Sequence, residues 1–209
     1  MSVEDGHIDK LVADIRNCTV CALAANPLPV TPNPIIRATP RSKIRIISQA
    51  PGTLAHASSL PFNDPSGRRL RDWLGVSPAE FFNPDNFAIT PMGFCFPGQD
   101  ENGGDLPPRP ECAPLWQHKL DASLQQTELT LLVGMYAVKH HLKIRMERNL
   151  TETVRHWRNY GPDIIPLPHP SWRNNAWIKK HDWFAEELDM LKRRVDELIT
   201  RDDTDIGIR

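Results

Sequence analysis

The chain has 209 residues, 40% of them hydrophobic and 24% charged, and its formal net charge is -1. This length and composition predict one soluble domain over residues 1–209, and they exclude both disorder throughout and the overall positive excess of many nucleic-acid binders. No run approaches the roughly 18 apolar residues that span a bilayer, and the N-terminus does not resemble a signal peptide, so we expect a cytoplasmic protein without membrane contact.

Charge is segregated along the chain. Residues 37–71 contain seven Lys and Arg against one acid, whereas residues 182–209 contain nine acids against five bases. A polyanion is therefore expected to meet a basic face while the acidic tail, residues 200–209, and the loop at residues 100–105 point elsewhere. The alternative is that these clusters are solvated helix faces.

The N-terminal arm, residues 1–40, is predicted to hold a helix over residues 8–16, a Cys18-x-x-Cys21 turn and an extended, proline-rich connection. The β-branched run at residues 44–47 predicts a strand that ends in a tight turn. A helix follows, with Ser66 as its expected cap and apolar positions at residues 70, 73 and 74.

Further strands are predicted at residues 87–90, 129–133 and 164–167, and helices at residues 114–124, 135–142 and 151–157. An amphipathic helix with apolar positions from Phe184 to Leu198 closes the chain. Because strands alternate with helices, we expect an α/β fold whose parallel sheet is covered on both faces and binds ligands at the carboxyl ends of its strands.

Two loops follow strands of this predicted sheet. Ser48-Gln49-Ala50-Pro51-Gly52 follows the first strand, and His169-Pro170-Ser171 follows the last. If these two strands lie side by side, the loops form one pocket. On its own, His169 before a proline also fits a simple strand end.

The four cysteines form one candidate ligand set. Cys18 and Cys21 are a C-x-x-C pair, while Cys95 and Cys112 have 16 residues between them and lie in loops rich in proline and glycine. Four thiolates with none left over favour a tetracoordinate site, because disulfides are disfavoured in a reducing compartment. Spacing alone leaves zinc and iron-sulfur open, and it favours a structural role.

Seven short motifs occur along the chain in this order: Cys18-x-x-Cys21, Ser48 to Gly52, Pro61-Phe62 with Ser66-Gly67, Cys95 before Pro97-Gly98, Glu111-Cys112, Leu132-Val133-Gly134, and Pro168-His169-Pro170-Ser171-x-Arg173-Asn174. Over roughly residues 15–195 they resemble the uracil-DNA glycosylase superfamily, most closely its branch with a four-iron four-sulfur cluster. The resemblance implies a three-layer αβα sandwich with a four-stranded parallel sheet, and it favours the cluster over zinc.

The resemblance also implies site roles. His169 would donate a hydrogen bond to uracil O2, Phe62 would stack on the base, and Gln49 with the amides of Ala50 to Gly52 would bound the pocket. Either His56 or Asp64 would activate water. Phosphates and the displaced strand would be contacted by Ser171, Trp172 as a wedge, Arg173, Arg68 and Arg69.

Two positions depart from the family pattern. Gln49 and the acid-free residues 53–58 replace a loop that usually carries acids, and Pro91 stands where an asparagine usually reads the base edge. The first hypothesis is thus a monomeric uracil-DNA glycosylase of base excision repair. The second is a protein that binds uracil or abasic sites with little excision, and a weaker third is a zinc-stabilised hydrolase of another nucleotide-like substrate.

Other residues have simpler expected roles. Phe62 alone fits the core, and Asp64 alone fits a turn or a helix cap. His140 and His141 are expected on the surface.

Overall fold

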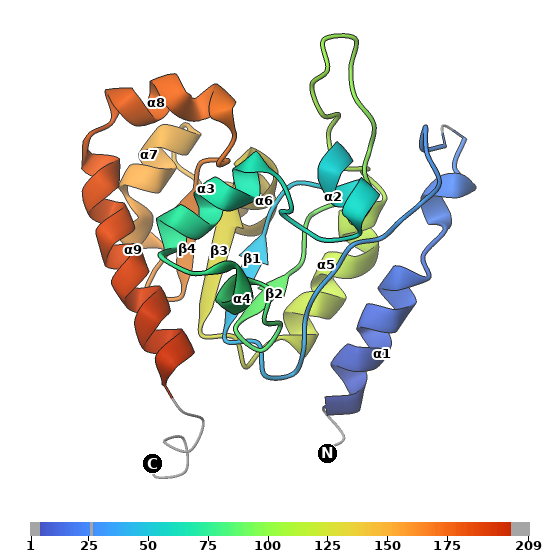
Figure 1. Ribbon diagram of the computed structural model, residues 1–209, viewed down its shortest axis with the longest axis horizontal. Helices are drawn as coiled ribbons and strands as arrows, with labels where there is room; N and C mark the ends of the chain where they lie inside the picture. Colours follow the sequence, from blue (N-terminus) through green and yellow to red (C-terminus); the bar gives the residue numbers. More distant parts are fainter. Residues whose placement is uncertain (1–4, 26, 202–209) are drawn as a thin grey trace.

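The computed structural model describes residues 5–25 and 27–201, so most of the predicted acidic tail lies outside the described residues. Its centre is one sheet of four parallel strands in the order β2-β1-β3-β4 (Figure 1). The strands are β1 (Ile44–Ile47), β2 (Phe87–Ile89), β3 (Leu129–Val133) and β4 (Ile164–Leu167). The predicted strands and their parallel arrangement are confirmed.

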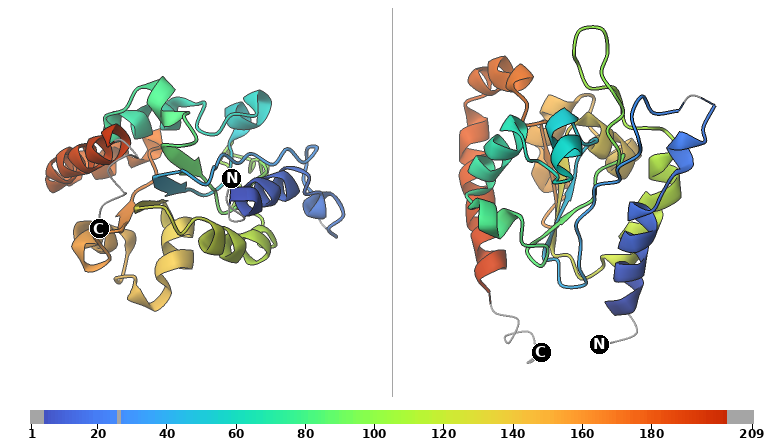
Figure 2. Two further views of the ribbon diagram at one scale, coloured as in Figure 1. Left: turned by 90° about the horizontal axis from the view of Figure 1, so that it is seen from below. Right: turned by 45° about the vertical axis from the view of Figure 1, so that its right-hand side comes forward.

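Helices cover both faces of this sheet, which confirms the predicted αβα sandwich. The α-helices are α1 (Asp5–Arg16), α2 (Thr53–Ser58), α3 (Pro65–Leu74), α4 (Pro78–Phe81), α5 (Cys112–Ser123), α6 (Met135–Leu142), α7 (Leu150–Arg155), α8 (Asn175–Lys180) and α9 (Trp183–Thr200). Short 3-10 turns are η1 (Val20–Ala22), η2 (Lys143–Arg145), η3 (Trp157–Asn159) and η4 (Trp172–Asn174). Helices α3, α4 and α9 lie on one face, and α1, α5 and α6 on the other (Figure 2).

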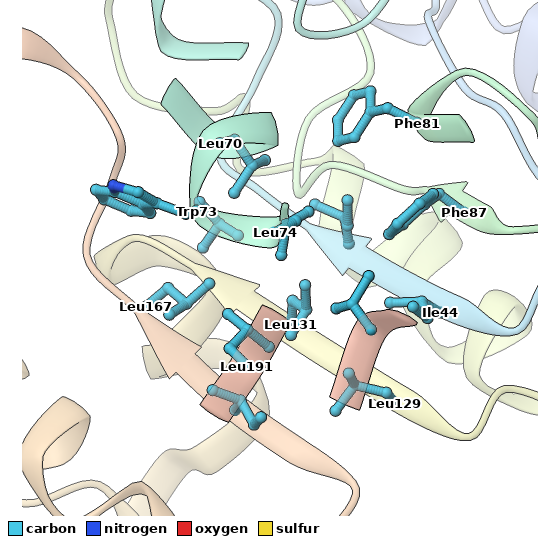
Figure 3. Packing of buried hydrophobic residues seen from close by; sticks show 14 of the residues in the cluster. Ile44, Leu70, Trp73, Leu74, Phe81, Phe87, Leu129, Leu131, Leu167 and Leu191 are labelled. Carbon is cyan, nitrogen blue, oxygen red and sulfur yellow. The ribbon is translucent and has the colours of Figure 1, made fainter. Parts of the chain in front are cut away.

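The larger core lies between the sheet and helices α3 and α9. Leu70 and Leu74 point from α3 toward the strands, and Leu131 of β3 meets them from below (Figure 3). All three side chains are buried. Each fully buried leucine contributes about 1.5–3 kcal/mol through the hydrophobic effect, so this cluster fixes α3 on the sheet.

Two local features differ from the predictions. Asp64, not Ser66, caps α3: its Oδ1 accepts a hydrogen bond from the Gly67 amide at 2.7 Å, and Ser66 lies inside the helix. The acid-free residues after Gly52 form helix α2 rather than an open turn. Aspartate and serine are both good caps, so the sequence did not distinguish them.

Two of the seven basic residues over 37–71 do not belong to the expected polyanion-binding face. Arg45 is buried in β1, where it donates to Thr90 Oγ1, Gln117 Oε1 and Asp121 Oδ1 at 2.6–3.0 Å. Arg37 donates to a backbone carbonyl. These two side chains bond to other parts of the protein instead of facing solvent. For Arg37 and Arg45, the expectation of an exposed basic face is wrong.

No helix among the described residues has both the length and the apolar character to cross a membrane.

His140 and His141 are half-buried rather than on the surface. Their rings are 4.9 Å apart, and His141 Nε2 is buried without a hydrogen-bond partner. Burial, together with the positive charge of Arg45, lowers the pKa of His141 to about 4, although Asp121 acts in the opposite direction. His141 is therefore neutral in the folded protein at pH 7.

We expect this histidine to make the fold sensitive to acid. Between pH 6.5 and 4 the unfolded chain binds a proton that folded His141 does not, so the free energy of unfolding falls as pH falls, by an amount on the order of 1–3 kcal/mol. Urea unfolding across this range measures it. His141→Gln should show a shallower fall than wild type or the exposed-site control His7→Gln; identical slopes for all three would contradict the assignment.

Candidate active site

A cavity of about 430 Å³ lies at the carboxyl ends of the strands, and both predicted loops line it. Strands β1 and β4 are not neighbours, contrary to the simplest expectation, because β3 lies between them. Both loops still line one cavity, and β3, which ends at Val133, is followed directly by Gly134. That residue has φ +88° and is followed at once by α6.

Gly134 gives the His169 side chain its place. A Cβ at Gly134 would lie 3.4 Å from His169 Cβ and 3.5 Å from its Cδ2, and the positive φ already disfavours any other residue. On the other side, Asn174 Nδ2 donates to the His169 carbonyl at 2.6 Å. These contacts hold the imidazole at the cavity wall.

His169 is surrounded by few compensating charges. Burial lowers its pKa, and the carboxylates of Asp64 and Asp105 only partly oppose this shift. The ring is therefore neutral at pH 7. A neutral imidazole with one N–H can donate to a developing oxyanion without bringing a full positive charge into the cavity.

Phe62 and Asp64 reach the cavity from the strained turn before α3. Phe62 has φ +57°, which is rare for a bulky residue, and its ring packs edge-on against Phe81 at 6.0 Å. Asp64 uses Oδ1 for the helix cap, which fixes the direction of its carboxylate. Phe62 therefore belongs to the core and to the cavity wall at once.

The far wall is built from backbone that continues past β1 and β2. Met92 N donates to Ser48 O, and Gly93 N donates to Gln49 O, at 2.9 and 2.8 Å. Pro91 lines the cavity, and its carbonyl is taken by Gln117 Nε2 at 2.8 Å. At the position of Pro91 the wall is thus apolar, while the Gln49 side chain supplies an amide.

The sequence did not predict the third contributor to the cavity, a hairpin over residues 98–106. It rises above the sheet in Figure 1 and brings Gln99, Gly103 and Asp105 to the cavity wall. Gln99 Nε2 donates to Asp105 Oδ1 at 3.3 Å. A glycine-rich loop with acids fits any surface turn, so no sequence signal marked it as part of the site.

Of the residues predicted to contact DNA, Ser171, Trp172 and Arg173 line the cavity, whereas Arg68 and Arg69 do not. Trp172 is 72% exposed, and Arg173 lies 5.8 Å from its ring. Arg68 is exposed, whereas Arg69 donates to the Ser171 carbonyl at 2.8 Å. Arg69 therefore supports the loop that carries His169.

His56 is not brought to the cavity. It lies on α2, its ring is 5.7 Å from that of Phe96, and its Nδ1 is buried without a hydrogen-bond partner. Ala50, Gly52, Gln49, Phe62 and Asp64 all line the cavity. Of the two groups predicted to activate water, Asp64 alone lies in its wall.

Cys95 and Cys112 interact electrostatically with Cys18 and Cys21, so the four cysteines lie near one another, and none forms a disulfide. Burial, with smaller contributions from the neighbouring thiols, raises the pKa of Cys95 to about 11 and that of Cys112 to about 12. Backbone amides of Asn33 and Phe94 hydrogen-bond these two sulfurs. Among the residues that the structure describes, no group of three or more His, Cys, Asp or Glu side chains is arranged to hold a metal ion.

The donor chemistry nevertheless fits an iron-sulfur group. A single zinc ion needs all four sulfurs about 2.3 Å from one point. A cluster of several iron and sulfur atoms holds its thiolates farther apart, and hydrogen bonds from amides to the sulfurs are typical of such sites. Arg109, which hydrogen-bonds Cys21, adds a positive charge beside the set.

The sequence model of the uracil DNA glycosylase superfamily matches residues 37–192. The chain belongs to this superfamily. The matched region includes every residue that lines the cavity, together with Cys95 and Cys112, whereas Cys18 and Cys21 precede it. The cavity between the two loops is thus the place where a glycosylase-like activity of this family member would reside.

We expect Gly67→Ala to disturb this site through the backbone. A Cβ at residue 67 would overlap the Phe62 carbonyl, so both the strained turn and the Asp64 cap must shift. The free energy of unfolding should fall by about 2 kcal/mol or more, as at other overpacked positions. Thermal melting measures it, with the exposed Asn63→Ala as control; an unchanged melting temperature for Gly67→Ala would contradict the geometry.

Proposed function

We propose that this protein is a DNA glycosylase that hydrolyses the bond between uracil and deoxyribose. The observation that supports this most is the neutral His169 in a base-sized cavity between two loops of the superfamily. Base-excising enzymes take the target base out of the helix and into such a pocket. Base excision repair is the process that uses this reaction.

Recognition in this proposal combines stacking with polar edges. The ring of Phe62 forms an apolar wall for the face of the base, and the Gln49 amide offers a donor and an acceptor to its edge. The amides of Ala50 to Gly52 bound the same side.

The chemical step needs stabilisation of opposite charges. As the glycosidic bond breaks, its electron pair leaves with the base, and His169 donates a hydrogen bond to the oxygen where negative charge develops. The sugar becomes cationic and is attacked by water. Asp64 is the proposed base that takes the water proton, because its carboxylate lies in the cavity wall.

DNA is the proposed partner, held mainly at the rim. Trp172 would fill the space left by the flipped nucleotide, and Arg173 and Arg68 would contact phosphates. Lys179 and Lys180 on α8 add positive charge at the same end of the molecule (Figure 1). This local distribution compensates for a net charge of only -1.

A four-iron four-sulfur cluster is the proposed cofactor, with Cys18, Cys21, Cys95 and Cys112 as its ligands. Such a cluster supplies positive iron that offsets four thiolates, and here its proposed role is structural. The chain's own part is to deliver two ligands from the N-terminal arm, one from the segment after β2 and one from the first residue of α5. Zinc remains the alternative occupant.

A second candidate is a protein that binds uracil or abasic sites with little excision. Pro91 favours it, because a proline offers no side-chain hydrogen bond and its carbonyl is already used by Gln117. With fewer hydrogen bonds to the base edge, the rate of base release would fall more than the affinity for the flipped sugar. Both candidates use the same cavity.

Excision is tested with an oligonucleotide that contains one uracil, as a single strand and as a duplex. We expect wild-type protein to leave an abasic site, and His169→Ala to slow single-turnover release by about 10²–10³-fold, the usual loss for one oxyanion donor. His118→Ala, an exposed histidine outside the cavity, is the matched control. Tight, salt-sensitive binding to abasic DNA with no release by wild type would instead establish the second candidate.

The cofactor is tested by analysis of protein purified without oxygen. We expect about four irons per chain and broad visible absorbance, both lost in Cys112→Ser together with a drop in melting temperature. Ser123→Ala on the same helix is a control that should keep both. A colourless protein with one zinc would contradict the cluster.

A further inference from the structure

The first loop of the cavity lacks an acid, yet an acid reaches it from elsewhere. Gln49 to Gly52 and the six residues of α2 carry no carboxylate. The Oδ2 atom of Asp105 lies 3.1 Å from the place where a Cβ on Gly52 would sit. Glycine at residue 52 leaves the space that this carboxylate occupies.

The hairpin that carries Asp105 is fixed on both sides of the cavity. Asp100 Oδ1 accepts from the Asn102 and Gly104 amides at 2.9 and 2.7 Å, which closes the tip. A Cβ on Gly104 would lie 3.2 Å from both terminal nitrogens of Arg173, so the tip packs against the loop that carries His169. The hairpin thus bridges the two loops of the superfamily.

Position within the cavity separates the two carboxylates. Asp64 has one oxygen committed to the α3 cap and lies beside Phe62, where the base would stack. Asp105 is exposed, at the open side of the cavity. Because a flipped nucleotide enters base first, its sugar remains at this open side.

We propose that Asp105 is a catalytic carboxylate that faces the deoxyribose and stabilises the positive charge that develops on its C1′ and O4′ atoms. This inference rests on the proposed glycosylase function. Asp105 transfers no proton: the water proton goes to Asp64, the oxygen of water bonds to C1′, and the electron pair of the broken bond leaves with the base. Asp105 thereby supplies the charge that the first loop lacks.

An acid on this face is unfavourable for binding DNA unless it meets a cation. A carboxylate near the DNA backbone repels its phosphates. Solvent and salt also weaken the electrostatic interactions of an ionised group at the mouth of a cavity. Once DNA covers the cavity, the same carboxylate acts in a drier environment and its attraction for a cationic sugar becomes stronger. The benefit of Asp105 therefore falls on the transition state rather than on the bound substrate.

A purely structural role of Asp105 predicts a different result. Asp105 also accepts from Gln99 and lies beside the start of α2, so it could serve only to brace the hairpin. In that case its loss would lower the melting temperature and weaken all DNA ligands alike. The sign of the charge on the ligand would not matter.

The test compares two abasic analogues in the same duplex, a neutral tetrahydrofuran and a cationic pyrrolidine. We expect wild type to bind the pyrrolidine duplex more tightly, and Asp105→Asn to lose about 10- to 100-fold of that preference, the worth of a charge-assisted hydrogen bond. Glu101→Gln, the same change of charge on the same hairpin, should keep the preference. Melting temperatures are measured alongside.

The rate of uracil release is the second test of the role of Asp105. With uracil DNA, Asp105→Asn should slow single-turnover release at least about 10-fold while binding of the tetrahydrofuran duplex stays within about twofold. An equal preference for the two analogues in wild type, or an unchanged preference in Asp105→Asn, would overturn the assignment. Absence of uracil release by wild type would refute the proposed activity, whereas the analogue comparison would still decide what Asp105 faces.

Discussion

The direction of the four strands decides where chemistry can occur in this molecule. Because all of them run the same way, the loops after β1, β2, β3 and β4 leave from one edge of the sheet. The intervening β3 separates the first and last loops by two strand spacings, about 10 Å. That separation suits a planar base, and Gly134, the residue after β3, lies beside His169. The positive φ of residue 134 disfavours any side chain there.

Charge in the cavity is arranged to match a reaction that separates charge. The group nearest the base in the proposed mechanism, His169, is kept neutral by burial, so it can donate without binding an anionic product too tightly. The groups nearest the water and sugar, Asp64 and Asp105, are carboxylates. Arg173 lines the cavity beside the exposed Trp172, and Arg68 is exposed on α3, where the proposed mechanism has them meet phosphates. The neutral donor next to the leaving base and the carboxylates next to the sugar match the charges that the breaking bond leaves on its two fragments.

The sequence predicted what depends on local pattern and missed what depends on distant contacts. The β-branched run at Ile44–Ile47 and the alternation with helices were enough for the sheet, and motif order was enough for the superfamily. Arg45 was misjudged because its partners Gln117 and Asp121 are more than 70 residues away. Asp105 had no signal either, since a hairpin reaches its target by folding rather than by spacing. The role of Asp64 was ambiguous in the sequence because this residue both caps α3 and lines the cavity.

The four cysteines and the cavity are linked through the N-terminal arm, which would connect the proposed cofactor to the proposed chemistry. Asn33 hydrogen-bonds the Cys95 sulfur with its amide, while its side chain donates to His56 O and Ser59 Oγ of the α2 region at 3.0 and 2.9 Å. Pro29 of the same arm packs against Gly98, at the base of the hairpin. The arm therefore contacts both the C-terminal end of α2 and the hairpin that carries Asp105. A group that ties Cys18 and Cys21 to Cys95 would thus hold the carboxylate and the first loop in register, although it lies outside the cavity.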